Sequence, residues 1–244
     1  MRVAVVSDVH SNLVALDAVL GAVGSIDAVW HLGDVVGYGP EPDAVVERLS
    51  AAGASGVRGN HDTAIAIDPG LLDWFNAEAR AAAEWTTATA TEATRAWLAA
   101  LPDRHLAHGV GLVHGSPRDP LWEYITSLPV ARENLAALAA MGATVGLHGH
   151  THVPVAMRAD GDRVEVIRPD DGDELALDER PTLVNPGSVG QPRDGDPRAS
   201  WLVFDTERRT CTWRRVAYDI PAVQAAMHAV HLPARLAARL SHGL

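Results

Sequence analysis

The chain has 244 residues, and its 20 basic and 31 acidic side chains give a formal net charge of −11. A hydrophobic share of 47% matches ordinary globular proteins and excludes intrinsic disorder. The acidic balance argues against bulk nucleic-acid binding, because that affinity comes from cationic side chains that displace counterions. About 150 residues per domain and the α/β pattern described below favour a single domain over residues 1–244.

The composition also limits the location and the metal chemistry. No apolar run approaches the roughly 18 residues that cross a bilayer, and MRVAVVSDVH becomes polar too early for a secretory signal. We therefore expect a cytoplasmic protein without membrane partners. The one cysteine, Cys211, excludes an internal disulfide and a thiolate cluster, so a bound metal would have nitrogen and oxygen ligands.

The first part of the chain repeats one pattern, in which an apolar strand ends in polar residues. Strands are predicted at 2–7, 28–32 and 55–58, and they run into DVHSN, GDVV and GNHD. Helices are predicted between them at 13–23 and 42–52. Ligands of open α/β sheets bind where strands end, so this repetition predicts a site at that edge.

The remaining chain predicts a helical insert, a second sheet and a C-terminal helix. Helical spacing in an Ala-, Trp- and Thr-rich stretch predicts two helices in an insert of about 68–104, which act either as a lid or as a packing pair. An amphipathic helix interrupted by Pro233 is predicted at about 219–241. Short strands are predicted at 111–114, 144–147, 153–159, 163–168, 182–185, 200–205 and 211–216.

Several short polar clusters near strand ends carry groups that bind metals. They are Asp8 with His10, Asp34, Asn60 with His61 and Asp62, His114, and His150 with His152. Taken singly, each also suits a turn, a cap or a core histidine. Together they offer the imidazole, amide and carboxylate groups that suit a pair of N/O-ligated divalent metals. In DVH and HTH, residues two apart can point to one side of a cavity.

Charge and glycine placement support this interpretation. Asp8 and Asp34 would repel each other across a dry cleft unless a cation lay between them. Glycines flank the candidate ligands, as expected where the backbone approaches a ligand closely. They are Gly33, Gly59, Gly115 and Gly149.

In this order, the motifs DVH, GD, GNHD, HG and GHTH resemble the calcineurin-like metallophosphoesterase superfamily. GDVVGYGP, VRGNHD, LVHGSP and VNPGSVGQPRDGDPRASW resemble its small bacterial members of the YfcE type, and the resemblance spans nearly the whole chain. It implies an α/β sandwich of two mixed sheets flanked by helices. It also implies two divalent metal ions per chain, Mn²⁺ or Fe first and Zn²⁺ or Ni²⁺ as alternatives.

The resemblance assigns roles to individual residues. Asp8, His10, Asp34 and His152 would hold the first metal, and Asp34, Asn60, His114 and His150 would hold the second. A hydroxide bridging metals about 3.5–4 Å apart would attack phosphorus in a small phosphate ester. His61 would contact the substrate and donate a proton to the leaving oxygen, and Asp62 is the nearest residue to orient it.

Four further residues are candidate substrate contacts. Asn12, Tyr38 and Arg58 lie on motif loops, and the Arg193 guanidinium suits phosphate oxygens. The NPGS segment at 185–188 has two interpretations: its backbone amides bind phosphate, or it is a tight turn capped by Asn185. The second interpretation is slightly favoured.

One departure separates the chain from other branches of this superfamily. Serine/threonine protein phosphatases carry GDxVDRG, whereas this chain has GDVVGYG, so Gly37 and Tyr38 replace an Asp and an Arg. We therefore expect a phosphoesterase for small esters, with diesters preferred because of the resemblance. Nucleotide polyphosphate or phosphoprotein hydrolysis is the alternative, and a non-catalytic metal-binding scaffold is a third hypothesis. The oligomeric state and the physiological substrate stay open.

Overall fold

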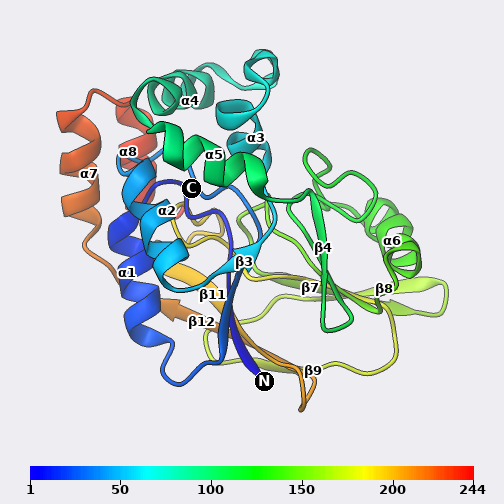
Figure 1. Cartoon of the computed structure of the whole chain (residues 1–244). Coiled ribbons are helices and arrows are strands. Elements are labelled where there is room, and N and C mark those ends of the chain that lie inside the picture. The colour runs from blue at the N-terminus through cyan, green and yellow to red at the C-terminus, as the bar shows by residue number, and fades with distance from the viewer.

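Two six-stranded β-sheets pack face to face, with helices on their outer faces (Figure 1). The structure is a computed structural model that describes residues 1–244. The first sheet has the order β3-β2-β1-β11-β12-β9 and the second β4-β5-β6-β10-β7-β8. This arrangement confirms the predicted α/β fold of two sheets flanked by helices.

The first sheet joins three parallel strands to three antiparallel ones. β1, β2 and β3 run parallel, and β11 pairs with β1 in the antiparallel sense. Helices α1 and α2 connect the parallel strands. The elements are β1 (Arg2–Val6), α1 (Leu13–Ala22), β2 (Ala28–His31), α2 (Pro42–Ala51), β3 (Ser55–Gly56), β9 (Glu174–Ala176), β11 (Ala199–Asp205) and β12 (Thr210–Val216).

The second sheet is built in the same way. β5, β6 and β10 run parallel, while β4, β7 and β8 pair in the antiparallel sense. Helix α6 packs on β7, β8 and β10. The elements are β4 (Arg104–Ala107), β5 (Val110–Val113), α6 (Leu128–Ala137), a short 3₁₀ helix (Leu138–Met141), β6 (Val145–Leu147), β7 (Val155–Asp160), β8 (Arg163–Ile167) and β10 (Thr182–Asn185).

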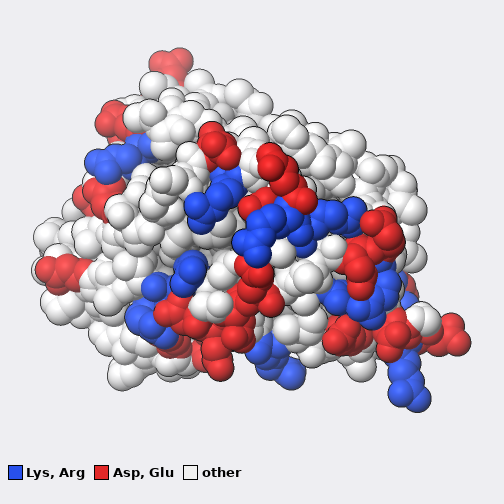
Figure 2. All heavy atoms as spheres, turned by 90° about the horizontal axis from the view of Figure 1, so that it is seen from below, with Lys and Arg blue, Asp and Glu red and all other residues white.

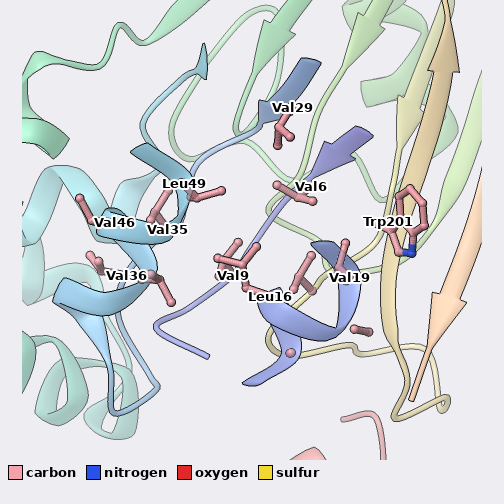
Figure 3. Close-up of a cluster of buried hydrophobic side chains, with 14 of the residues drawn as sticks. Val6, Val9, Leu16, Val19, Val29, Val35, Val36, Val46, Leu49 and Trp201 are labelled. Atoms are coloured by element: carbon pink, nitrogen blue, oxygen red, sulfur yellow. The ribbon is translucent and has the colours of Figure 1, made fainter. Parts of the chain in front are cut away.

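Strand β1 is buried on both faces, and its side chains alternate between two cores. Val3 and Val5 point into the core between the sheets, whereas Ala4 and Val6 belong to the cluster under the helices. Figure 3 shows Val6 and Val9 facing Leu16 in this second cluster. Full burial of a valine or leucine contributes about 1.5–3 kcal/mol. Both cores therefore fix where β1 ends and its polar loop begins.

The insert and the C-terminal helices pack together above the first sheet. In Figure 1 the red α8 lies beside the teal α4. Buried side chains join them, including Ala79 and Ala82 from α4, Leu236 from α8, and Tyr38. The elements are α3 (Asn60–Ala66), a 3₁₀ helix (Pro69–Trp74), α4 (Ala77–Thr89), α5 (Glu92–Ala100), α7 (Ile220–Ala229) and α8 (Ala234–Leu240).

The structure differs from the sequence-based expectations in a few elements. Helices α3 and α6 and strands β4 and β9 were not predicted. The GNHD motif, taken as a loop, is the start of α3, and α6 buries Ala131 and Leu135 at helical spacing. β7 begins at Val155 instead of 153, because Pro154 has no N–H for the sheet ladder. The predicted pair of insert helices is present as α4 and α5, and the C-terminal helix breaks before Pro233 as expected.

The surface carries both signs of charge. Figure 2 shows basic and acidic side chains interspersed on the face seen from below. Exposed pairs such as Arg209–Glu179, 3.1 Å apart, each contribute about 0–1 kcal/mol. No helix of the structure has the length and apolar character to cross a bilayer.

One buried histidine makes the fold sensitive to acid. His31 on β2 is fully buried, and neither ring nitrogen has a hydrogen-bond partner. Burial lowers the pKa of its imidazole from 6.5 to about 4. As the pH falls through 6.5 the unfolded chain takes up a proton here, but the folded chain does so only near pH 4. The free energy of unfolding therefore falls as the pH is lowered from 6.5 to about 4.

We predict that His31→Phe removes this part of the acid sensitivity. Between pH 7.5 and 5.0 the free energy of unfolding of the unchanged, chelator-treated protein should fall by about 2 kcal/mol more than that of the variant. Urea denaturation at both pH values measures it, and exposed His105→Phe is the control. An equal fall in both proteins would contradict the role of His31.

Candidate metal centre

The ends of strands from both sheets meet at one edge and bring seven candidate ligands together. Those from the first sheet follow β1 and β2 or begin α3, and those from the second follow β5 and β6. Every one of them is at most 5% exposed. They are Asp8, His10, Asp34, Asn60, His114, His150 and His152.

The ligands form two groups that meet at Asp34. In the first group, His152 Nε2 lies 3.2 Å from Asp8 Oδ1 and 3.2 Å from His10 Nε2. His10 Nε2 lies 3.7 Å from Asp34 Oδ2.

In the second group, His114 Nε2 lies 3.4 Å from Asp34 Oδ2, 3.1 Å from Asn60 Oδ1 and 3.0 Å from His150 Nδ1. Asp34 Oδ2 is therefore within 3.7 Å of an imidazole from each group. The structure thus brings the residues of both predicted ligand sets close together.

Each of the four imidazoles forms a hydrogen bond to a backbone carbonyl with one ring nitrogen and turns the other nitrogen to the centre. The pairs are His10 Nδ1 with Val36 O (3.2 Å), His114 Nδ1 with Leu32 O (2.8 Å), His152 Nδ1 with Gln191 O (2.6 Å) and His150 Nε2 with Trp122 O (3.3 Å). A carbonyl only accepts, so these nitrogens carry the hydrogen. The remaining nitrogens then present lone pairs to one another, and a cation between them removes that conflict.

The carboxylates fit a cation in the same way. Asp8 Oδ1 is buried without a hydrogen-bond donor, while Oδ2 accepts from Ser7 Oγ and the His150 N–H. Burial raises the pKa of Asp8, but the imidazoles of His152 and His114 outweigh it and hold the pKa below its usual value. Without metal, burial lowers the pKa of His114 while Asp34 raises it more, to about 9. A proton on His114 then supplies part of the charge that a metal would bring.

The ligand loops are held in a backbone conformation that most residues avoid. Five ligands have positive φ: Asp8 (52°), His10 (49°), Asp34 (49°), His150 (66°) and His152 (60°). Each such residue costs on the order of 1–3 kcal/mol and persists only where the surroundings enforce it. Here the two loops bond each other, with the Asp8 N–H on Gly33 O at 3.1 Å and the His10 N–H on Asp34 O at 3.0 Å.

Two of the predicted glycines allow chain segments to approach the ligands. A Cβ on Gly59 would lie 2.1 Å from Asp34 Oδ1, and one on Gly149 would lie 2.0 Å from Ser7 Oγ. Neither position can hold a side chain without displacing a ligand carboxylate or its hydrogen-bond donor.

The NPGS segment supports the ligand loops as a turn. Asn185 donates to Gly149 O at 2.7 Å and accepts from the Gly187 N–H at 2.8 Å. Ser188 Oγ donates to Asp8 O at 2.8 Å. The Gly187 amide is therefore engaged within the protein, in agreement with the favoured turn interpretation.

His61 lies beside both ligand groups in a small aromatic cage. Its ring centroid is 4.5 Å from Tyr38, 4.5 Å from Phe75 and 5.0 Å from His10. Its buried Nδ1 has no hydrogen-bond partner, and a Cβ on Gly37 would lie 2.5 Å from it. Burial lowers the pKa of His61 to about 4.

The structure does not place Asp62 where it could orient His61. Its Oδ1 accepts from the Val36 N–H at 3.1 Å and its Oδ2 from the Gly59 N–H at 2.9 Å. Asp62 thus joins the start of α3 to the loop after β2. No side chain takes the orienting position, since Gly37 faces the free Nδ1.

The four predicted substrate contacts divide into two pairs. Asn12 caps α1 by accepting from the Ala15 N–H and donates to Gly190 O, and Arg58 pairs with Asp103 at 2.7 Å, so both are engaged elsewhere. Tyr38 is part of the aromatic cage, and its ring centroid lies 4.5 Å from that of His10. The Arg193 guanidinium lies over the Tyr38 ring, 5.8 Å from its centroid.

Three aromatic residues at the site were not predicted from the sequence. Phe75 contacts His61, the Trp122 carbonyl accepts from His150, and Tyr124 stacks on His150 at 3.8 Å. Trp122 and Tyr124 follow the His114 motif by no more than ten residues, which is the one sequence signal that pointed to them.

Comparisons with known proteins agree with this geometry. A family model of the calcineurin-like phosphoesterase superfamily domain matches residues 1–209. An uncharacterized protein of Methanocaldococcus jannaschii is 32% identical, with 99% of this chain and 98% of the relative covered.

Two solved structures share the fold over the whole chain. A crystal structure of a metallophosphoesterase from Sphaerobacter thermophilus has a TM-score of 0.90 at 41% identity, covering 100% of this chain and 99% of that one. A hypothetical protein from Pyrococcus horikoshii has a TM-score of 0.79 at 22% identity, covering 100% and 98%. With the ligand motifs in the expected order and folded into one centre, the chain belongs to the calcineurin-like phosphoesterase superfamily.

Proposed function

We propose that the protein is a metal-dependent phosphoesterase that hydrolyses small phosphate esters at this centre with two divalent cations. The observation that carries the proposal is the pair of buried donor groups Asp8–His10–His152 and Asp34–His114–His150. The donor atoms of each group lie within 4.8 Å of one another, and Asp34 Oδ2 lies 3.7 Å from His10 Nε2. Asp8, His10, Asp34 and His152 hold one cation, and Asp34, Asn60, His114 and His150 the other. Mn²⁺ or Fe is our first assignment, and Zn²⁺ or Ni²⁺ also suits these donors.

The protein's own groups position the substrate and handle the leaving oxygen. When bound, the cations supply Lewis-acid stabilisation of the phosphoryl oxygens and a water activated at neutral pH. Nδ1 of His61 has no hydrogen-bond partner in the protein. Burial lowers the pKa of this imidazole to about 4, so the negative charge of a bound phosphate has to raise that pKa before the ring can give a proton to the ester oxygen that leaves. The aromatic cage restricts movement of the ring and keeps water from its Nδ1 side.

Charge at the mouth supports a preference for diesters. The Arg193 guanidinium lies over the Tyr38 ring, which flanks His61, and we propose that it binds the phosphate of the substrate. The Arg residue of GDxVDRG is replaced by Tyr38. A single guanidinium matches the one negative charge of a phosphodiester better than the greater charge of a monoester or polyphosphate. The same replacement argues against a phosphoprotein substrate.

Metal removal and replacement test this function directly. Chelator-treated protein should lose hydrolysis of bis(4-nitrophenyl) phosphate and regain it with Mn²⁺. The value of kcat/KM for this diester should exceed that for the monoester 4-nitrophenyl phosphate, which carries the larger negative charge. Two bound metals per chain with no turnover of either ester would favour the scaffold hypothesis, and faster monoester turnover would overturn the diester preference.

We predict that Asp34→Asn loses metal and activity together, because one carboxylate serves both donor groups. Metal analysis after gel filtration should give fewer than two Mn²⁺ per chain and no measurable turnover. Asp178→Asn, at a half-exposed carboxylate far along the chain, is the control and should keep both. Full occupancy of both sites in Asp34→Asn would contradict the assignment.

We predict that His61→Ala keeps its metals but lowers kcat about 10²- to 10⁴-fold, the range that general acid catalysis supplies. His105→Ala removes an exposed imidazole and should leave kcat unchanged. Steady-state kinetics and metal analysis of both variants measure this. A loss smaller than threefold in His61→Ala would exclude its part in the reaction.

A further inference from the structure

Aromatic side chains are concentrated around the metal centre. The chain has only 3 tyrosines and 2 phenylalanines, yet Tyr38, Tyr124 and Phe75 all lie here, and Trp122 joins them. We call these four residues the aromatic rim. They come from three separate loops, after β2, after α3 and after β5.

The rings of the aromatic rim flank the centre at two places. Tyr38 and Phe75 flank His61 at 4.5 Å each, and Phe75 meets Trp122 edge to face at 5.9 Å. Tyr124 stacks on the ring of His150 at 3.8 Å with 24° between the planes. Aromatic rings thus lie beside both the candidate acid and a ligand of the second group.

Protein packing does not account for Tyr124. Its side chain is 47% exposed and belongs to none of the buried hydrophobic clusters. One face of the ring rests on His150, and the exposed part of the residue is open to solvent. A large ring exposed beside a charged centre is a ready surface for another planar ring.

Arg193 lies beside the same centre. Its guanidinium carbon is 5.8 Å from the centroid of the Tyr38 ring, which flanks His61. One terminal nitrogen donates to Gln191 Oε1 at 2.9 Å. A guanidinium carries further N–H groups, so it can bind a phosphoryl oxygen while an aromatic ring holds the ester group.

We propose that the substrate is a phosphate ester bearing a planar aromatic group, aryl or nucleobase, which stacks on the exposed Tyr124 ring. Arg193 binds a phosphoryl oxygen of the same molecule. This inference rests on the proposed phosphoesterase function and names the substrate class for that site. Tyr124 is then a specificity-determining residue. Because its ring also stacks on His150, the test compares two ligands in the same protein, so that a change in the metal centre affects both alike.

Two diesters with the same leaving group test the inference by kinetics. Phenyl 4-nitrophenyl phosphate and methyl 4-nitrophenyl phosphate differ only in the group that stays on phosphorus. The phenyl-to-methyl ratio of kcat/KM should be about 10-fold higher for the unchanged protein than for Tyr124→Ala, since stacking contributes about 1–3 kcal/mol. Tyr124→Phe should keep the ratio, and so should Leu128→Ala, which removes another exposed apolar side chain.

Binding tests the inference without turnover. In calorimetry on Mn²⁺-loaded protein, phenylphosphonate should bind about 10-fold more tightly than methylphosphonate, and Tyr124→Ala should remove the difference. The comparison holds even if neither diester is hydrolysed, a result that would count against the proposed function alone. Equal binding of the two phosphonates, or an unchanged ratio in Tyr124→Ala, would overturn the aromatic substrate class.

The thymidine 5′-ester of 4-nitrophenyl phosphate separates the two sources of a planar ring. A kcat/KM above that of the phenyl diester, lost in Tyr124→Ala, identifies a nucleobase as the stacked group. A lower value, with the phenyl preference intact, identifies a simple aryl ester.

Discussion

The structure depends on one electrostatic constraint: two buried carboxylates and four imidazole lone pairs are held within a few ångströms of one another. His10 Nε2 and His152 Nε2 lie 3.2 Å apart, and each ring already donates its hydrogen to a backbone carbonyl. Added positive charge stabilises such a set, because carboxylates and lone pairs at these distances repel one another. We infer that divalent cations satisfy it in the working protein.

The fold supplies the rigidity that this crowded centre requires. The candidate ligands follow buried strands of each sheet, so their loops start from fixed points. Positive φ at Asp8 and Asp34 is held by hydrogen bonds between neighbouring loops, and the Ser188 turn supports Asp8 from the other side. The cost of the strained backbone is offset by two hydrophobic cores, one of which takes Val9 and Val35 from the ligand loops themselves.

The residues that gather at the candidate centre could be predicted from the sequence because each lies within a few residues of a strand that is readable from its apolar run. Asn60 and Asp62 show the limit of that approach, since the helix they begin depends on contacts with the loop after β2. The second-sheet strands were recognised, but the short edge strands β4 and β9 carry little local signal. Of the aromatic rim only Tyr38 was predicted, and Tyr124 was missed because it meets His150 only once the loop after β5 folds over the centre.

The proposal that Asp34 lies between two divalent cations is tested most directly by anomalous diffraction from crystals grown with Mn²⁺. Two anomalous peaks should flank the Asp34 carboxylate about 3.5–4 Å apart. One peak should contact Asp8, His10 and His152, and the other Asn60, His114 and His150. A single peak, or none, with the Asp34 carboxylate in its present position would contradict a dinuclear centre.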